Sequence, residues 1–198
     1  METKNMVIEY LTDLQDFAFI EYDGTIITNK PISVEDILEL EKQFNNGKIF
    51  PKALRELLFL AGSSCKLLDY SIFSSQREIQ ESIIEDLKND GLEMKRPYYV
   101  LEIYDAGSTF YFVYLDEGDN PIVYVAKNEY EKLEFIKIAD SLSAFLSNLI
   151  KSNKEDIERK NDYLKFLEDE RERDLQKTPE TVYSIIKKWI KAIYNKKS

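Results

Sequence analysis

Carboxylates are the side chains of this sequence that could take part in the most kinds of chemistry, because its 198 residues include no histidine. Without an imidazole, Ser-His-Asp catalysis, Cys-His catalysis, histidine metal ligation and a histidine pH switch are all excluded. Acidic side chains gather between positions 102 and 119, where a general acid and base pair or a hard-metal site is conceivable. These acids are Glu102, Asp105, Asp116, Glu117 and Asp119.

The spacing of these acids matches no catalytic or metal-binding template. Residues 116–120 lack the ligand order and the closing glutamate of a calcium loop, whereas Asp and Gly in such a run are typical of turns. The six glycines are scattered singly, so no phosphate-binding loop is present and nucleotide enzymes are disfavoured. We therefore expect a protein with no catalytic residue, no metal site and no cofactor.

Cysteine usage and the hydropathy pattern predict a cytoplasmic protein. Cys65 is the single cysteine, so the chain holds no internal disulfide. With only Lys66 or a helix end to activate its thiol, Cys65 is predicted to be a small, partly buried core residue. Residues 1–10 do not resemble a signal peptide, and no apolar run approaches the length of a membrane-spanning helix.

Charge is segregated along the chain, whose formal net charge is -10. Residues 1–150 hold 27 acids and 14 bases, whereas residues 151–198 hold 10 acids and 13 bases. The first part should repel nucleic-acid phosphates and attract a basic protein, so we expect a protein partner and no direct binding of nucleic acid. An ordinary solvated acidic surface would produce the same charge balance.

The first 62 residues predict a short helix and strand followed by a helical hairpin. Residues 6–20 indicate a helix and then a strand, and Asp23-Gly24 is a turn signal before a second short strand over 25–28. A capped amphipathic helix is predicted from Ser33 to residue 44, and another from Pro51 to a stop at Gly62.

An antiparallel meander is predicted for the middle of the chain. Residues 66–73 suggest a strand, and residues 76–89 have helical spacing. Aromatic and β-branched residues then form four strands joined by short turns, over 98–104, 109–115, 121–126 and 133–138. Within 109–115, apolar side chains occupy both faces, so we expect both faces of the sheet to be covered. A helix should begin at Ser141.

Residues 151–198 predict a helical extension. The segment 151–175 is typical of a solvated helix, and Thr178-Pro179 predicts a new helix start before an apolar stripe that includes Trp189. We expect this extension to pack on the domain formed by residues 1–150. The alternative is that the 179–194 helix lies on a membrane surface or docks on a partner.

The order of these features resembles the SUKH superfamily, the Smi/Knr-type domain, over residues 33–150. The resemblance rests on apolar and turn positions in four segments. They are Ile37-x-x-Leu40-Glu41-x-x-Phe44, then Phe50-Pro51-x-x-Leu54-x-x-Leu57-Leu58-x-Leu60-x-Gly62, then Tyr104-Asp105-Ala106-Gly107 with the aromatic strand and Gly118-Asp119-Asn120-Pro121-Ile122-Val123-Tyr124 after it, and Ser141-Leu142-x-x-Phe145-Leu146-x-x-Leu149.

This resemblance implies an α+β fold in which an antiparallel sheet of about four to six strands packs with helices. It also implies a non-catalytic binding protein. Bacterial members of the family are immunity proteins that neutralise a toxin domain, often a nuclease, and fungal relatives regulate cell-wall glucan synthesis. We expect an immunity protein for a basic toxin, with an intracellular regulator or scaffold of cell-wall synthesis as the alternative.

Charge and loop position, rather than the family, predict the partner-binding residues. Carboxylates in the loops should cover a basic cleft, and tyrosines beside them should act as aromatic anchors. The predicted set is Glu102, Tyr104, Asp105, Asp116, Glu117, Asp119 and Tyr124.

Overall fold

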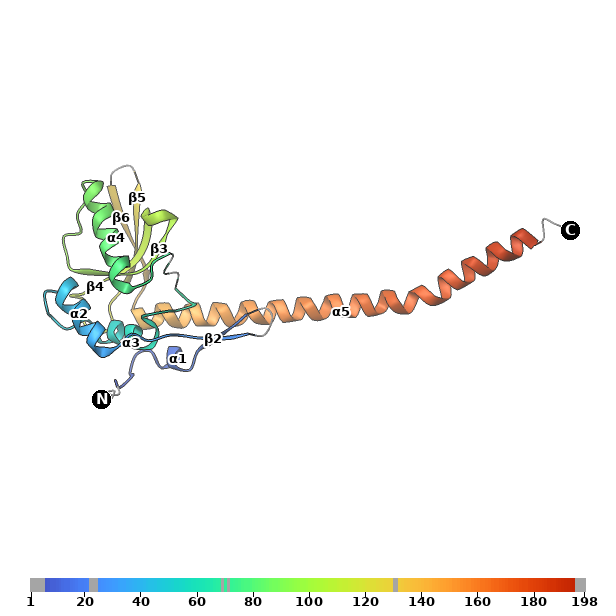
Figure 1. The fold of residues 1–198 in the computed structure, drawn as a ribbon, viewed down its shortest axis with the longest axis horizontal. Coiled ribbons are helices and arrows are strands. Elements are labelled where there is room, and N and C mark those ends of the chain that lie inside the picture. The colour runs from blue at the N-terminus through green and yellow to red at the C-terminus, as the bar shows by residue number, and fades with distance from the viewer. Residues whose placement is uncertain (1–5, 22–24, 69, 71, 130–131, 195–198) are drawn as a thin grey trace. The chain divides into compact units, whose positions relative to one another are not determined.

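The computed structural model describes residues 6–21, 25–68, 70, 72–129 and 132–194, and the chain divides into two compact units, residues 1–151 and 152–198. The first unit contains a four-stranded antiparallel sheet, a two-stranded sheet and several helices (Figure 1). This architecture confirms the predicted α+β fold class. That residues 151–198 pack on the domain stays a prediction.

The main sheet is the predicted meander, with strand order β3-β4-β5-β6 and antiparallel pairing throughout. Its strands are β3 (Tyr98–Tyr104), β4 (Thr109–Tyr114), β5 (Val123–Glu129) and β6 (Lys132–Ala139). A bulge lies between Val100 and Glu102 on β3. The 3-10 turn η1 (Asp105–Gly107) joins the first two strands.

Both faces of the sheet are covered at β3 and β4, as the alternation in β4 predicts, whereas β6 is mostly exposed. Phe110 and Phe112 are fully buried with Ile83 of helix α4 (Gln76–Asn89) in one cluster. Val113 points to the opposite face and belongs to a second, larger cluster, which also contains residues of helices α2 (Val34–Phe44) and α3 (Lys52–Ala61) and of the first turns of α5 (Leu142–Tyr194). The two clusters share the backbone of β3 and β4, so the loops at the ends of these strands are held from both sides.

Local signals explain the predicted helices α2 (Val34–Phe44) and α3 (Lys52–Ala61). Ser33 Oγ accepts the Asp36 N–H at 3.0 Å while Asp36 Oδ2 accepts the Ser33 N–H at 3.1 Å, which is the reciprocal capping box. Pro51 precedes α3 as its N-cap residue. Ile37 and Leu40 of α2 and Leu54, Leu57 and Leu58 of α3 are buried together in the larger cluster, which confirms the hairpin.

Two buried glutamates tie loops to these helices. Glu56 of α3 is fully buried and accepts the backbone N–H groups of Glu9, Tyr10 and Leu11 at 2.9, 2.9 and 3.0 Å. Glu41 of α2 accepts the Phe50 N–H at 2.9 Å and lies 3.1 Å from Arg55 Nε. A buried carboxylate is stable only where hydrogen-bond donors of the protein replace the water molecules that would solvate it. Here the donors are mainly backbone N–H groups of loop segments, which the two glutamates hold against the helices.

The N-terminal segment matches its prediction of a helix and then a strand. It forms α1 (Thr12–Gln15), β1 (Ala18–Ile20) and β2 (Ile26–Thr28), and the last two pair as a small antiparallel sheet. The predicted turn at Asp23-Gly24 lies outside the described residues.

The predicted strand over 66–73 is wrong for the residues that are described there. The backbone forms turns and bends, and pairing in this region is limited to the isolated bridge between Lys30 and Ser64. The apolar side chains have a different role, since Leu68 is buried in the larger cluster and Tyr70 donates its hydroxyl to the Ala61 carbonyl at 3.0 Å. Apolar residues at this place therefore cover the end of α3.

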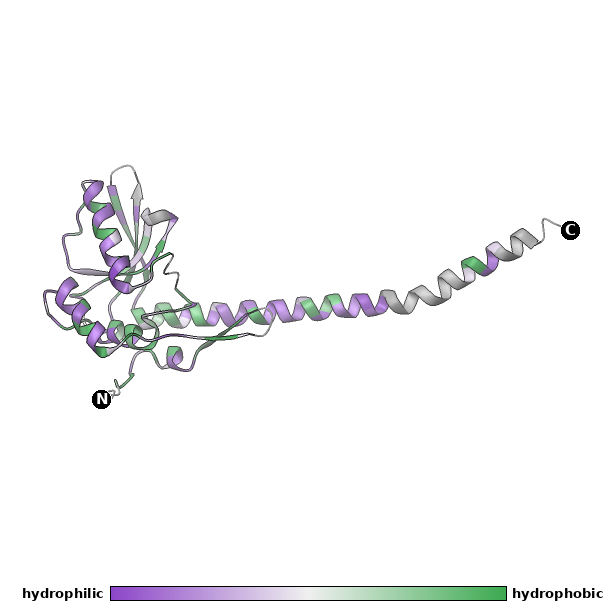
Figure 2. Ribbon diagram, in the orientation of Figure 1, coloured by the Kyte–Doolittle hydropathy of each residue, from purple (hydrophilic) through white to green (hydrophobic). Residues whose placement is uncertain are grey.

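The predicted helix start at Thr178-Pro179 is also wrong, because α5 is one helix from Leu142 to Tyr194. The fixed φ of proline is compatible with helical geometry and its interior position removes one backbone hydrogen bond. Long flanking helical sequences on both sides maintain the helix across that position. In the coloured parts of α5 after residue 151, Figure 2 shows both hydrophobic and hydrophilic residues.

Candidate partner-binding site

The tight link between β3 and β4 creates the first part of the site. Asp105 and Gly107 of η1 both adopt positive φ, 49° and 95°. The Asp105 carbonyl accepts the backbone N–H and the hydroxyl of Ser108 at 3.2 and 3.0 Å, which closes the turn. This turn lies beside the C-terminal end of α4.

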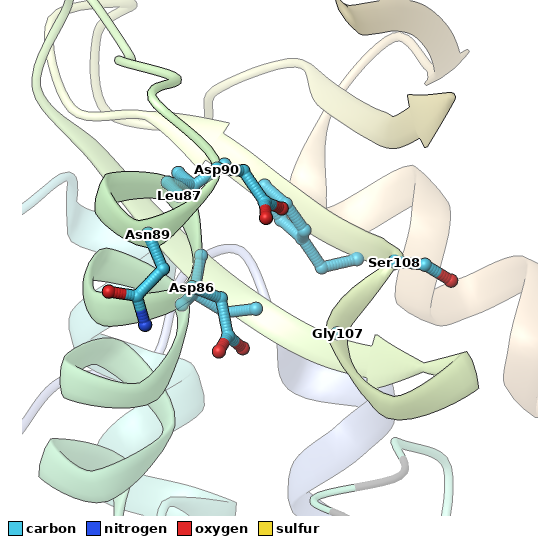
Figure 3. A pocket seen from close by; sticks show the side chains of 8 residues that line it. Asp86, Leu87, Asn89, Asp90, Gly107 and Ser108 are labelled. Carbon is cyan, nitrogen blue, oxygen red and sulfur yellow. The ribbon is translucent and has the colours of Figure 1, made fainter. Parts of the chain in front are cut away.

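A cavity of about 210 Å³ lies between this turn and the end of α4 (Figure 3). Ile83, Leu87 and Phe110 are buried and provide its apolar floor. Its rim is polar and consists of Asp86, Asn89, Asp90 and Ser108, with Gly107 at one side. We call this cavity the acidic pocket.

Gly107 is required for the shape of the acidic pocket. A Cβ at this position would lie 2.8 Å from Asp86 Oδ2 and 3.8 Å from Ile83 Cδ1, and its φ of +95° disfavours any residue with a side chain. The close-up shows Gly107 on the turn opposite the Asp86 side chain (Figure 3). Glycine therefore lets the turn approach α4 while the carboxylate stays in place.

The electrostatics of the acidic pocket suit a cation. Asp86 lies in the last turn of α4 and Asp90 is its C-cap residue, where the helix dipole already has its negative end. Among the residues that the structure describes, no Lys or Arg forms an ion pair with Asp86 or Asp105. An apolar floor with an acidic rim matches a Lys or Arg side chain, which has an apolar stem and a charged head.

The opposite end of the sheet carries a second cluster, centred on Arg96. Its guanidinium contacts Asp116 Oδ2 at 3.2 Å through Nε and Glu117 Oε1 at 3.0 Å through Nη1, and it stacks 3.8 Å from the centre of the Tyr114 ring. Tyr124 donates its hydroxyl to Glu117 Oε1 at 3.2 Å. The hydrogen bond from Arg96 holds the pKa of Asp116 below its usual value.

Aromatic rings surround Phe112 beneath this Arg96 cluster. Tyr124 stacks on Phe112 at 5.5 Å, and Tyr98, Tyr114 and Phe135 approach it edge-on at 6.3, 5.0 and 5.6 Å. Desolvation raises the pKa of the Tyr98 hydroxyl to about 12. Phe135 of β6 remains 44% exposed, so the cluster has an apolar surface as well as a charged edge.

The structure places five of the seven predicted binding residues in two separate groups. Tyr104 and Asp105 lie at the η1 end of the sheet, and both are exposed. Neither lines the acidic pocket, and the Tyr104 ring packs on Tyr111, on the face of the sheet opposite Phe110. Asp116, Glu117 and Tyr124 lie in the Arg96 cluster. In an antiparallel meander consecutive loops lie at opposite ends, so the six residues of β4 separate the groups by roughly 20 Å.

The remaining two predicted residues, Glu102 and Asp119, make hydrogen bonds within the fold. Glu102 is 3% exposed and accepts a hydrogen bond from the Tyr104 hydroxyl, because the bulge turns it into the sheet. Asp119 is exposed, and its carbonyl accepts the Ala53 N–H at 2.8 Å at the start of α3. A direct contact of these seven residues with a partner stays a prediction.

Sequence reasoning missed Asp86, Asp90 and Arg96. In the sequence, Asp90-Gly91 indicates a helix end. Asp86 and Asp90 then lie in the last turn and at the cap of that helix, where negative charges oppose the helix dipole, and this signal could have identified them. Arg96 lies between elements, and its partners follow 20 residues later in the chain. Its role depends on the strand register, which the sequence does not specify.

Three further observations concern the thiol, metal binding and membrane spanning. Cys65 is buried, and burial raises the pKa of its thiol. Within the described parts of the chain, no three Cys, Asp or Glu side chains converge into a group that could hold a metal ion. No described helix combines the length and the apolar character needed to cross a membrane.

Comparison with known proteins gives one family. The family model described as SMI1 / KNR4 family (SUKH-1) matches residues 31–148, which is more than half of the 198-residue chain. The match begins just before α2 and ends within α5, so it includes α4 and the whole main sheet. Neither the search of curated proteins nor the search of solved structures found a significant match.

Proposed function

Because the chain belongs to the SMI1/KNR4 family (SUKH-1), we propose that it is a non-catalytic protein-binding module, namely an immunity protein that neutralises a cognate toxin by stoichiometric association. We propose further that the toxin is a basic, nuclease-type domain. The family supports immunity or regulatory roles in general, and the acidic pocket supports the choice of a basic partner.

The single observation that carries the proposal is the placement of carboxylates at the negative end of α4. Acids at a helix C-terminus cost about 0.3 to 1 kcal/mol each in fold stability. Asp86 and Asp90 occupy such positions and line a cavity with a buried apolar floor. Residues that violate a local rule of stability are commonly functional, and here they create a receptor for a cationic side chain.

In the proposed mechanism, the acidic pocket receives a Lys or Arg from the nucleic-acid cleft of the toxin. That side chain then no longer contacts phosphate, and the body of the bound protein blocks access to the cleft. The excess of acids in residues 1–150 steers the encounter, so the association rate should fall as salt is added.

Tyr104 is the proposed aromatic anchor at the same end of the sheet as the acidic pocket, on the opposite face. Its ring packs 5.3 Å from Tyr111, and its hydroxyl is held by Glu102, while 37% of the residue remains exposed. A tyrosine held in this way loses little conformational entropy on binding, which favours affinity. In the Arg96 cluster, by contrast, the carboxylates already have a cationic partner.

The test compares two doubly neutralised variants in binding to toxin domains encoded beside the gene. Asp86→Asn with Asp105→Asn removes one charge from the rim of the acidic pocket and one from the adjoining turn η1, and asparagine tolerates the positive φ of Asp105. Glu85→Gln with Glu93→Gln is the matched control, since both glutamates are exposed and neither lines the pocket. Thermal melts establish that both variants fold.

We expect the pocket variant to bind the toxin about 100-fold more weakly and the control variant to bind within about threefold of the wild type. Equal affinities of the two variants would contradict the site. Failure of every adjacent toxin domain to bind, with capture of a cell-wall synthesis protein instead, would favour the regulator or scaffold alternative. That alternative rests on the family alone, since no described residue specifically favours it.

A further inference from the structure

The second unit, residues 152–198, exposes large apolar side chains on one side of its helix. Tyr163, Leu164 and Leu167 form one group, with 60%, 47% and 42% of their surface exposed. Ile185, Ile186 and Trp189 form another, with 50%, 51% and 70% exposed. Successive helical residues are rotated by about 100°, so positions 22 apart differ in direction by only about 40°.

The six side chains therefore point to the same side of α5, and we call these six residues the apolar stripe. Phe166 is also exposed, at 51%, but it points about 130° away from the centre of the stripe. Single helices gain little stability in water, and an amphipathic helix normally buries its apolar side against a neighbour. The stripe needs an occupant of matching length and chemistry.

Charge along this unit identifies the occupant. Residues 152–173 contain eight acids and six bases, whereas residues 174–198 contain two acids and six bases. One half therefore has a charge of -2 and the other has +4. The two groups of the apolar stripe lie at nearly equal distances on either side of position 176, close to the boundary between the charged halves.

We propose that the occupant is a second copy of this chain, with residues 152–194 of the two copies paired as antiparallel helices. In an antiparallel arrangement centred near position 176, Leu164 of one copy lies near Trp189 of the other, and Leu167 lies near Ile186. It also sets each acidic half against a basic half. A parallel pair would cover the stripe equally well, but it would align the two +4 halves, and repulsion between them selects against it.

The first test measures self-association of the full chain by sedimentation equilibrium from about 1 to about 200 µM. We expect a monomer-dimer equilibrium that weakens as salt is raised, because salt screens the pairing of opposite halves. Leu167→Ser and Trp189→Ser should each raise the dimer Kd about 100-fold, since a dimer contains each position twice. Phe166→Ser is the matched control and should leave the Kd unchanged.

The second test measures the orientation. A spin label at Asp162→Cys, in a Cys65→Ala background, lies on the side of α5 away from the apolar stripe. In the antiparallel dimer two labels are separated along the axis by twice fourteen residues, or about 42 Å, whereas a parallel dimer brings them to about 20 Å. Pulsed electron spin resonance distinguishes these distances.

A strictly monomeric chain at all concentrations would overturn the proposal. A monomer whose stripe is covered by its own chain, or one that sediments with vesicles of anionic lipid, would overturn it in the same way and identify the actual occupant. A dimer that the two stripe substitutions leave intact, or one with the short label distance, would also contradict it. Because none of these measurements requires the toxin, their outcome is independent of the proposed function.

Discussion

Removal of the buried carboxylate of Glu56 should destabilise the protein and release the N-terminal segment around residues 9–11 from α3. Glu56 accepts three consecutive backbone N–H groups, from Glu9, Tyr10 and Leu11, and no part of it is exposed to solvent. Glu56→Ala removes all three acceptors at once. The Leu11 N–H is then buried without a partner, whereas those of Glu9 and Tyr10 are partly buried and can reach water.

The magnitude follows from these contacts. A hydrogen bond to a charged group contributes about 1.5 to 3 kcal/mol, and an unsatisfied buried donor costs about 1 to 3 kcal/mol. With two of the three donors rehydrated and the desolvation of Glu56 itself relieved, we expect a net loss of about 3 kcal/mol. For a domain of this size, that loss lowers Tm by about 6 to 12 °C.

Urea denaturation at pH 7 and amide hydrogen exchange together test this prediction. The Leu11 amide should lose protection in Glu56→Ala more than amides of the main sheet. Glu56→Gln retains one acceptor oxygen and should cost about half as much. Glu9→Ala is the surface control, because its pair with Lys52 is exposed and should contribute little to stability. Loss of under about 1 kcal/mol in Glu56→Ala, or an unchanged Leu11 amide, would refute the reasoning.

Four further predictions concern the acidic pocket, the thiol and the Arg96 cluster. Asp86→Asn should raise stability by about 0.3 to 1 kcal/mol in a thermal melt, since it removes a negative charge from the C-terminal turn of α4; a lower Tm would argue against the helix-dipole account. Gly107→Ala should cost at least about 1 kcal/mol, through its positive φ and the approach to Asp86, and a neutral result would show that the turn can relax. Because burial raises the pKa of the Cys65 thiol, a thiol reagent should modify the folded protein far more slowly than the protein in urea, and equal rates would contradict its burial. Arg96 lowers the pKa of Asp116 in the folded state, so the pair stabilises the fold above the unfolded pKa and this contribution is lost as pH falls through the lowered folded pKa. Asp116→Asn should therefore cost under about 1 kcal/mol at pH 7 and nothing in strong acid, which urea melts at both pH values would check.

Local patterns predict the elements that depend on near neighbours in the chain. The alternation of aromatic and β-branched residues identifies β3 with its observed bounds, Tyr98–Tyr104. The capping box of Ser33 and Asp36 places the start of α2, because both partners lie within one helical turn. Such features have the same geometry whatever surrounds them.

Other features depend on contacts between distant segments. The acids of the predicted binding set are close in sequence, yet the meander carries Asp105 and Asp116 to opposite ends of β4. The acidic pocket combines α4 with η1, and its existence requires knowledge of which helix end faces which turn. Residues 66–73 failed as a strand for a related reason, since apolar composition indicates burial without specifying a neighbouring strand.

The continuity of α5 shows a limit of predicting helix ends from start and stop residues in the sequence. Thr178-Pro179 is a good helix start in isolation, but it is equally compatible with the interior of a long helix when the flanking residues are strong helix formers. A start signal is informative where a stop signal precedes it. Residues 151–177 contain no glycine or proline that would end the helix first.

Titration of a toxin's nuclease activity with the purified protein tests the central claim most directly. The account predicts a linear loss of activity that is complete at one equivalent of this chain per toxin domain. It also predicts that Asp86→Asn with Asp105→Asn shifts the curve to large excess, while Glu85→Gln with Glu93→Gln leaves it unchanged. Residual nuclease activity at saturating protein, or equal curves for both variants, would contradict inhibition through the acidic pocket.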